Sequence, residues 1–374
     1  MIENYSHNMQ GCSSNRTKII ELVLNHTCNF RCNYCYTQYE DEAYSNQKVM
    51  NSETLERVIQ YILKEYSITK NNGQMLYLSI LGGEPMLMAK SLTKIFESIY
   101  DTDIKVTVYT NGSLISKNKK LIKTWRCGFN DFYRFAFAIS FDYVLNNKNR
   151  CKNSYNKVVD AIKWLDDNNI QVKTVSAFNT EDLNQFHNVF GDFDRIQSTL
   201  KNNRFPFQFQ VNRRNGIHIP HDAHESLGCV GNYIIANNIP IKHYKSKTLG
   251  GMKNKRYNCG LGWRVICGID YDGGLYPCNG AIWGTSEKSC EVFKYATVYD
   301  SYDDIVTKRT ELTNKVLSNL KEHEKCQSCN NICKVCPLTK VTDSNSFDKV
   351  DSLPSDDVCE LFGLMSQCLY APRN

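Results

Sequence analysis

The sequence lacks the long apolar runs that mark membrane-spanning and secreted chains. Its 374 residues contain no apolar stretch of the ~18 residues that cross a bilayer, and the first residues contain no apolar segment of a secretory signal. Basic residues do not interleave with aromatic ones as in a surface that stacks nucleic-acid bases, and there is no internal repeat or low-complexity tract. We therefore expect a cytoplasmic protein that binds neither membrane nor nucleic acid.

Cysteine, by contrast, is abundant and clustered. The chain has 17 cysteines, of which three lie within residues 28–35, three within 259–278 and four within 326–336. Thiols stay reduced in the cytoplasm, so a disulfide framework is not expected, and the clustering predicts metal binding. The formal charge of +6 arises from 45 basic and 39 acidic side chains spread along the chain, which does not indicate a nucleic-acid tract.

Six short apolar, β-rich segments lie in the first 211 residues. Helical patterns separate most of them, and one runs from Leu55 to Leu63 at helical spacing with Asn51 or Ser52 as its N-cap. Strands that alternate with helices predict an α/β fold with a parallel sheet, and six units are too few for a closed eight-stranded barrel. We expect a partial (β/α)6 TIM-like barrel. Its predicted strands are Ile19–Leu24, Met75–Leu81, Ile104–Tyr109, Phe135–Ile139, Val172–Ala177 and Phe207–Val211.

Each predicted strand is followed directly by a polar motif. CNFRCNYC follows the first strand, GGEP the second, TNG the third and SFD the fourth, and FN and NRR follow the last two. In a parallel α/β barrel the carboxyl ends of the strands meet at one mouth, where active sites lie. The sequence therefore predicts that six loops face one site.

The first of these motifs has the spacing C-x3-C-x2-C, with Cys28, Cys32 and Cys35. A [4Fe–4S] cube normally takes four thiolates, so three on one loop leave one iron open to a small molecule. The alternative is a zinc site that lacks a ligand, but structural zinc sites usually pair two C-x2-C elements and close all four positions. The spacing favours the cluster.

This motif resembles the signature of the radical S-adenosylmethionine (SAM) superfamily, in which an aromatic residue precedes the third cysteine. Tyr34 stands at that place. The resemblance implies an enzyme whose open iron binds SAM and whose reduced cluster cleaves SAM to a 5′-deoxyadenosyl radical. It also implies an electron donor such as flavodoxin or ferredoxin. No catalytic residue beyond the cluster ligands is assigned.

The other motifs supply the residues that the resemblance assigns to SAM. GGEP matches the family's motif for the SAM amino group, with Glu84 as an acceptor, although GGEP alone is also a turn before a helix. TNG and SFD are also typical of strand-ending turns and caps. Arg213 is a candidate partner for the SAM carboxylate, for which Arg214 competes. The predicted cofactor-binding residues are Tyr34, Gly82, Gly83, Glu84, Pro85, Asn111, Ser140, Asp142, Asn179 and Arg213.

Eight of the cysteines in the second half are enough for two further cubes. The C-x2-C pairs within residues 326–336 strongly indicate metal binding, and zinc also fits them. The pattern resembles the SPASM extension, which holds two auxiliary [4Fe–4S] clusters. Its opening is matched by Cys259, Gly273 and Cys278. The spacings around Cys267 and within 326–336 depart from the family's, so Cys290 and Cys368 are alternative ligands. By order, the resemblance assigns Cys259, Cys267, Cys278 and Cys336 to one cluster, and Cys326, Cys329, Cys333 and Cys359 to the other.

We expect three parts: a radical SAM barrel over residues 1–212, a bridging or substrate-facing segment over 213–257 and a SPASM domain over 258–374. About sixteen residues precede the first strand, which is too few for a folded leader-binding domain. A leader would then be bound by a separate protein, the barrel edge or the bridging segment, or no leader is used.

The resemblance favours a peptide maturase that abstracts hydrogen from a precursor peptide and so forms a C–C, ether or thioether crosslink, an oxidised residue or an epimer. Formylglycine formation is less favoured, because Asn279 follows Cys278 where sulfatase-maturating relatives carry an Asp that acts as base. The alternatives are a radical SAM dehydrogenase of a sugar or alcohol and a non-enzymatic zinc scaffold.

Overall fold

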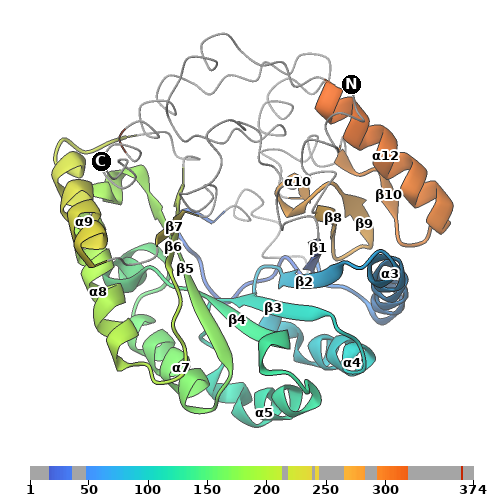
Figure 1. The fold of residues 1–374 in the computed structure, drawn as a ribbon, viewed down its shortest axis with the longest axis horizontal. Helices are drawn as coiled ribbons and strands as arrows, with labels where there is room; N and C mark the ends of the chain where they lie inside the picture. The colour runs from blue at the N-terminus through green and yellow to red at the C-terminus, as the bar shows by residue number, and fades with distance from the viewer. Residues whose placement is uncertain are drawn as a thin grey trace.

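The strands of the protein form one curved, open sheet. The computed structural model describes residues 17–35, 48–212, 218–237, 241–243, 265–282, 293–318 and Leu364. The strand order is β10-β9-β8-β1-β2-β3-β4-β5-β6-β7, so β10 and β7 stand at opposite ends and the described strands do not close into a barrel. Figure 1 shows the sheet as an arc with the helices along its outer side.

All six strands predicted from the sequence are present, and each pairs in parallel with the next. Their carboxyl ends therefore lie along one edge of the sheet, which confirms the α/β fold with a parallel sheet. The strands are β1 (Thr17–Val23), β2 (Met75–Leu81), β3 (Lys105–Thr110), β4 (Phe135–Ser140), β5 (Gln171–Asn179) and β6 (Phe207–Asn212).

Helices connect these strands and begin where local sequence signals place them. Helix α3 has Asn51 as its N-cap, as predicted, and the Asn51 side chain accepts a hydrogen bond of 2.9 Å from the backbone N–H of Thr54. The α-helices are α3 (Ser52–Asn71), α4 (Ala89–Ile99), α5 (Lys119–Gly128), α6 (Asn146–Asn149), α7 (Tyr155–Asp167) and α8 (Phe186–Thr199). The 3-10 turns are η2 (Pro85–Met88), η3 (Ser116–Asn118), η4 (Phe132–Arg134), η5 (Tyr143–Leu145) and η6 (Thr180–Gln185).

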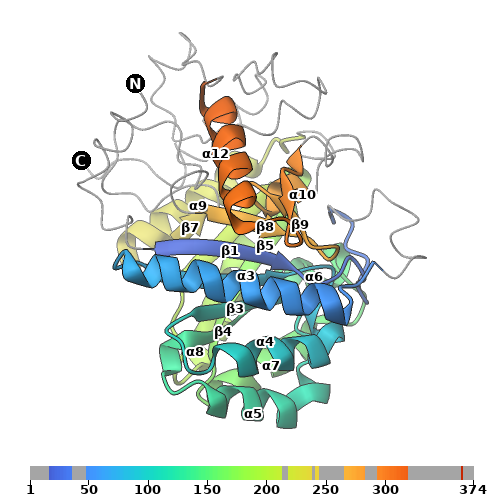
Figure 2. The same ribbon diagram turned by 90° about the vertical axis from the view of Figure 1, so that its right-hand side faces the viewer.

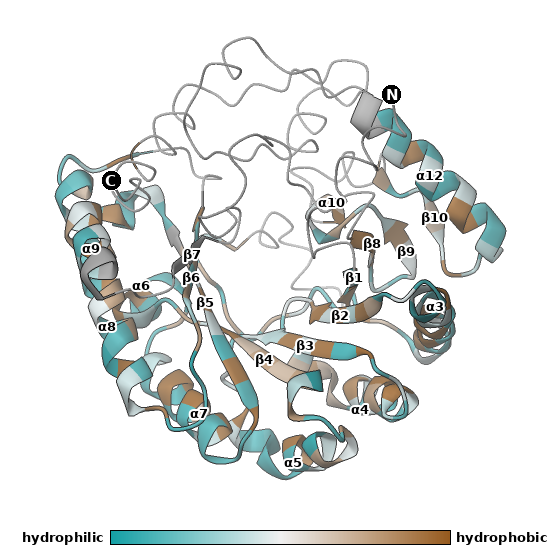
Figure 3. Cartoon of the chain, viewed as in Figure 1, coloured by the Kyte–Doolittle hydropathy of each residue, from teal (hydrophilic) through white to brown (hydrophobic). Residues whose placement is uncertain are grey.

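Alternate residues of the central strands face opposite sides of the sheet. In β2, Leu76, Leu78 and Ile80 are buried in the core between the sheet and the outer helices. Tyr77 and Ser79 are only partly buried and lie on the other, concave side. Figure 3 shows the hydrophobic residues concentrated on the strands, while the helices carry both colours. The concave side is thus the polar side of the sheet.

An aromatic cluster fills the core between α4, α5 and β4. Phe96 is fully buried, and its ring centroid lies 5.1 Å from that of Trp125, 5.7 Å from that of Phe129 and 5.3 Å from that of Phe135. These edge-to-face contacts are the favoured geometry for aromatic pairs. The cluster therefore fixes the outer helices on the strands whose ends carry the site.

The elements after β6 extend the sheet at both ends. The sequence patterns above predict none of these elements. The segment 213–257, which we expected to be bridging, contains a helix and a strand that pairs with β6. At the other end of the sheet, β8 pairs in parallel with β1. The start of the cysteine-rich region is therefore built onto the barrel sheet. The elements are α9 (Ala223–Asn237), β7 (Ile241–His243), β8 (Val265–Ile269), β9 (Gly274–Tyr276), α10 (Asn279–Ile282), β10 (Ala296–Thr297) and α12 (Tyr302–Ser318).

Helix α12 is fastened to α3 by a buried ion pair. Arg309 Nη1 lies 2.8 Å from Glu65 Oε1, and the hydroxyl of Tyr61 donates to the same carboxylate at 3.0 Å. The side chain of Glu65 is only 4% exposed, and these two partners provide the hydrogen bonds that its carboxylate no longer makes to water. Figure 2 shows α12 rising beyond the β8–β9 end of the sheet.

Within the described ranges, no helix has both the length and the apolar character that a bilayer crossing requires.

We expect Phe96→Ala to lower the free energy of unfolding by about 3–5 kcal/mol, because the substitution removes a fully buried ring and leaves a cavity among three aromatic neighbours. Urea denaturation of the two proteins measures the difference. Tyr133→Ala is the matched control, since that ring is 63% exposed and its loss should change stability by less than about 0.5 kcal/mol. Equal stability of Phe96→Ala and the parent would contradict the assigned core.

Candidate active site

The cysteine loop follows β1 at the carboxyl edge of the sheet and is tied to the loop after β2. The backbone N–H of Gly83 donates to the carbonyl of Asn25 at 2.8 Å, and the N–H of Glu84 donates to the carbonyl of Thr27 at 2.8 Å. The Asn25 side-chain amide donates back to the Glu84 carbonyl at 3.2 Å. The loop that carries Cys28 and the GGEP motif therefore form one structural unit.

Glycine is required in this unit because two backbones approach closely. A Cβ at Gly83 would lie 2.2 Å from the carbonyl oxygen of Thr27, a distance that no side chain tolerates. Gly82 has φ +153°, and a Cβ there would lie 2.5 Å from the Asn25 side chain. Gly82 and Gly83 are among the residues predicted to bind SAM. The structure shows that they first allow the cysteine loop to come close.

The Glu84 carboxylate holds two of the loops at the carboxyl edge of the sheet together. Its side chain is fully buried, and its carboxylate accepts hydrogen bonds from the Thr110 hydroxyl at 2.6 Å, the Asn111 N–H at 2.8 Å and the Met86 N–H at 3.0 Å. Burial raises the pKa of Glu84, and these hydrogen bonds oppose the shift. The carboxylate links the end of β2 to the end of β3. Its predicted contact with the SAM amino group stays a prediction.

Asn111 brings the TNG motif against the first cysteine. Its Nδ2 lies 3.8 Å from Cys28 Sγ and donates to Asn29 Oδ1 at 2.8 Å, while the backbone N–H of Phe30 donates to Cys28 Sγ at 3.3 Å. N–H groups aimed at a cysteine sulfur are one of the means by which proteins stabilise iron–sulfur thiolates. Asn111 therefore contributes to the site, through the cysteine rather than through a demonstrated ligand contact.

The three thiols fit a cluster loop. Burial is the largest cause that raises the pKa of Cys28 to about 12 and that of Cys32 to about 11, and Cys35 lies close enough to add to both shifts. Metal binding would have to displace those thiol protons. No three His, Cys, Asp or Glu side chains in the described ranges converge on a single ion's position. A cube differs from such a site because its ligands bind separate corners.

A buried network supports the loop from the side of β4. The hydroxyl of Tyr34 donates to Asp142, and Arg150 Nη1 donates to the Tyr34 oxygen at 2.8 Å. Asp142 also accepts the N–H of Ala177 at 2.9 Å, and its pKa is raised by burial and held down by the Arg150 charge. The Arg150 charge opposes the rise that burial causes in the pKa of Cys32. Arg150 is a residue that motif reading missed, since nothing in its spacing marks it.

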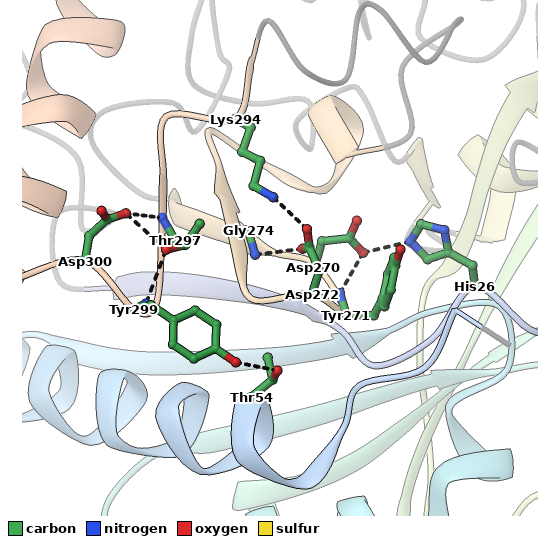
Figure 4. Close-up of polar contacts among 10 residues, drawn as sticks. All are labelled: His26, Thr54, Asp270, Tyr271, Asp272, Gly274, Lys294, Thr297, Tyr299 and Asp300. Atoms are coloured by element: carbon green, nitrogen blue, oxygen red, sulfur yellow. Dashed lines mark hydrogen bonds and ion pairs between the residues drawn. The ribbon is translucent and has the colours of Figure 1, made fainter.

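A second pair joins the cysteine loop to the hairpin of β8 and β9. His26 Nε2 lies 2.7 Å from Asp270 Oδ1, both side chains are 9% exposed, and the His26 ring packs edge-on against Tyr271 with centroids 4.8 Å apart (Figure 4). Asp272 accepts the N–H of Gly274 at 2.8 Å within the same hairpin. His26 lies two residues before Cys28, so this hairpin fixes the start of the cluster loop.

The described cysteines of the predicted auxiliary clusters have different surroundings. Cys278 follows the β8–β9 hairpin, whose turn has Gly273 at φ +82°. Cys267 lies within β8, is fully buried in the core and has its sulfur 3.7 Å from the Tyr61 hydroxyl of α3. Burial raises the pKa of Cys267 to about 12. Its predicted role as a ligand of an auxiliary cluster stays a prediction.

The remaining predicted residues divide into two groups. Ser140 ends β4 and Asn179 ends β5, so the structure brings both to the mouth, and no partner for the Ser140 hydroxyl lies in the described part of the chain. Pro85 opens η2 directly after Glu84, as the motif predicts. The others lie outside the described residues: Arg213, Cys259, Cys326, Cys329, Cys333, Cys336 and Cys359.

Comparison with known protein families identifies the domain that carries this site. The model of the Radical SAM superfamily matches residues 22–190, which run from β1 into α8 and include the cysteine loop, GGEP and Asp142. Residues 22–190 form a radical SAM domain. This match agrees with the superfamily that the cysteine motif predicts, over this part of the chain.

Two curated relatives share part of the sequence. The radical SAM cyclopropyl synthase TigE of Paramaledivibacter caminithermalis is 27% identical over 190 residues, covering 47% of this chain and 38% of TigE. The antilisterial bacteriocin subtilosin biosynthesis protein AlbA of Bacillus subtilis is 24% identical over 295 residues, covering 75% of this chain and 58% of AlbA. This chain thus matches about two fifths and three fifths of these relatives' lengths.

Solved structures share the fold. Native anSMEcpe with bound AdoMet superposes with a TM-score of 0.66 at 18% identity, covering 94% of this chain and 97% of that chain. Streptococcus suis SuiB bound to S-adenosylmethionine gives a TM-score of 0.61 at 16% identity, covering 91% of this chain and 75% of that chain. At these identities the likeness concerns the fold.

We expect Gly83→Ala to remove most of the iron that Cys28, Cys32 and Cys35 are predicted to bind, because the new Cβ would overlap the Thr27 carbonyl and push the cysteine loop out of place. Iron content per chain and visible absorbance of anaerobically purified protein measure the effect. Gly191→Ala in α8 is the control, since its Cβ would meet nothing within 4 Å. Full iron content in Gly83→Ala would show that the loop does not depend on this close approach.

Proposed function

We propose that the protein is a radical SAM peptide maturase. When bound, SAM and a [4Fe–4S] cluster on Cys28, Cys32 and Cys35 supply a 5′-deoxyadenosyl radical that abstracts hydrogen from a residue of a precursor peptide. The product is a C–C, ether or thioether crosslink, an oxidised residue or an epimer. The observation that carries the proposal is the cysteine loop held against GGEP at the carboxyl edge of a radical SAM domain.

The described residues have defined tasks in this proposal. The glycines and Glu84 hold the loops after β1, β2 and β3 together. Arg150 and Asp142 fix Tyr34, and the Arg150 charge favours an anionic sulfur at Cys32. The Ser140 hydroxyl is available for the SAM carboxylate or ribose. The protein thereby positions the cofactor and excludes water, while the cofactor carries the radical chemistry.

Support for a peptide substrate comes from relatives. AlbA is named for the biosynthesis of a bacteriocin, and anSMEcpe has been solved with AdoMet and the Cp18Cys peptide, at a TM-score of 0.64 and 17% identity over 94% of this chain. For this chain we propose a precursor peptide, a flavodoxin or ferredoxin as electron donor, and a separate leader-binding protein if a leader is used. We also propose that it acts in the reducing cytoplasm, where its thiols remain available to iron.

We further propose two auxiliary [4Fe–4S] clusters in residues 258–374, which would accept the surplus electron of the oxidation. Cys278 is the described residue that best fits such a ligand. Cys267 is the eighth ligand in the proposed assignment, and Cys290 and Cys368 are its alternatives. Formylglycine formation stays the less favoured alternative, since Asn279 carries no carboxylate that takes up a proton.

Metal analysis tests the cluster number. We expect about twelve irons per chain in the anaerobically reconstituted protein and about eight when Cys28, Cys32 and Cys35 are all replaced by Ala, since each cube holds four. Cys267→Ala should keep the full iron content if it is a core residue. Zinc without iron in protein purified without air would contradict the proposal.

Activity tests the reaction. With dithionite and SAM, the reconstituted protein should form 5′-deoxyadenosine, and the Cys28/Cys32/Cys35→Ala variant should form none because it lacks the cluster that SAM requires. The peptide encoded beside the gene should change in mass or stereochemistry, as measured by mass spectrometry and chiral amino-acid analysis. If SAM is cleaved and that peptide is unchanged, while a sugar or alcohol is oxidised, the dehydrogenase alternative is correct.

A further inference from the structure

The concave side of the sheet carries two lysines that lie over tyrosine rings. Lys105 of β3 is the direct cross-strand partner of Tyr77 in β2, and its Nζ lies 5.7 Å from the centre of that ring. Lys173 of β5 lies with its Nζ 5.5 Å from the ring centre of Tyr109 in β3. Both lysines are half-buried. A lysine over an aromatic face gains a modest electrostatic attraction that does not replace a counter-charge.

The register explains how Lys173 reaches Tyr109 across an intervening strand. Tyr109 pairs with Ala138 of β4, and Ala138 pairs with Lys173, so the three residues form one row across the sheet. The methyl group of Ala138 leaves the space that the lysine side chain crosses. Ser140 and Val175 form the pair two residues closer to the carboxyl edge on the same face. Lys173 therefore lies directly below the mouth, while Lys105 lies deeper.

Lys173 has no counter-charge among the residues that the structure describes. No carboxylate of the described part of the chain forms an ion pair with Lys173. Burial lowers the pKa of Lys173, and the nearby Tyr77 hydroxyl opposes this shift. The carboxylate on the same face, Glu21 of β1, instead accepts the backbone N–H of Asn279 at 2.7 Å. A partly desolvated ammonium group without an anion is costly, and a ligand that supplies the anion removes that cost.

We propose that Lys173 anchors a carboxylate of the substrate, either an acidic side chain or a chain terminus, on the concave face beneath the radical site. Tyr109 holds the lysine side chain in position, and Ala138 keeps the path between them open. The residue is thus a specificity determinant that selects an acidic substrate. This inference rests on the proposed radical chemistry at the mouth and adds the charge of the substrate to it.

Binding of three short peptides tests the inference. The probes are acetyl-Ala-Glu-Ala-amide, acetyl-Ala-Ala-Ala with a free carboxyl terminus, and the neutral acetyl-Ala-Gln-Ala-amide, each titrated by NMR into the anaerobically reconstituted enzyme with SAM. We expect at least one acidic peptide to bind about tenfold more tightly than the neutral one, since a partly buried charge gains a partner. The first two probes distinguish a side chain from a terminus as the source of the carboxylate.

Variants assign the preference to one lysine. Lys173→Met should abolish the preference for the acidic peptide, and Lys173→Arg should retain part of it. Lys105→Met, which removes the matched lysine deeper on the same face, should leave the preference unchanged. Lys173→Gln replaces Lys173→Met if circular dichroism shows that the latter is unfolded. Equal binding of acidic and neutral peptides to the parent, or a preference that survives in Lys173→Met, would overturn the assignment.

The same preparations separate this inference from the proposed function. Formation of 5′-deoxyadenosine by the reduced parent enzyme, together with equal binding of the acidic and neutral peptides, would refute the lysine anchor alone. A charge preference in an enzyme that forms no 5′-deoxyadenosine would support the anchor and refute the proposed chemistry.

Discussion

The close contact between the backbones of Gly83 and Thr27 is the constraint on which the site depends. It brings the loop after β2 into hydrogen bonding with the loop after β1, and the Glu84 carboxylate then extends this unit to the end of β3. Each contact uses backbone groups or a buried carboxylate, so the start of the cysteine loop is anchored by the protein's own groups. The aromatic core behind the strands holds their ends at the spacing that these hydrogen bonds require.

The support for the cysteine loop comes from distant parts of the chain. Arg150 and Asp142 fix Tyr34 from the β4 side, and Asp270 fixes His26 from the β8–β9 hairpin. An arginine charge that favours thiolate at Cys32 stands on one side, and a buried histidine–aspartate pair stands on the other. The polar concave face, which carries Lys105 and Lys173, lies beneath the cysteine loop.

Sequence patterns predict the barrel half well because each strand is a short β-rich run and each helix has an apolar stripe that must be buried. They also predict the cysteine loop and GGEP, whose spacings are local. They do not predict Arg150, His26 or Lys173, since these residues act through partners that are distant in sequence and close only after folding. The spacing of Cys267 also does not reveal that its side chain lies in the core beside the Tyr61 hydroxyl, because that contact joins β8 to α3.

The parallel pairing of β1 with β8 has a consequence for how the chain is made. About 240 residues separate the two strands, so one edge of β1 has no partner until nearly three quarters of the chain has left the ribosome. At bacterial and eukaryotic elongation rates this interval is on the order of tens of seconds. During this time the unpaired backbone edge of β1 can pair with another nascent chain. Expression yield should therefore depend on chaperones that cover this edge, and slower translation before Val265 should lower it.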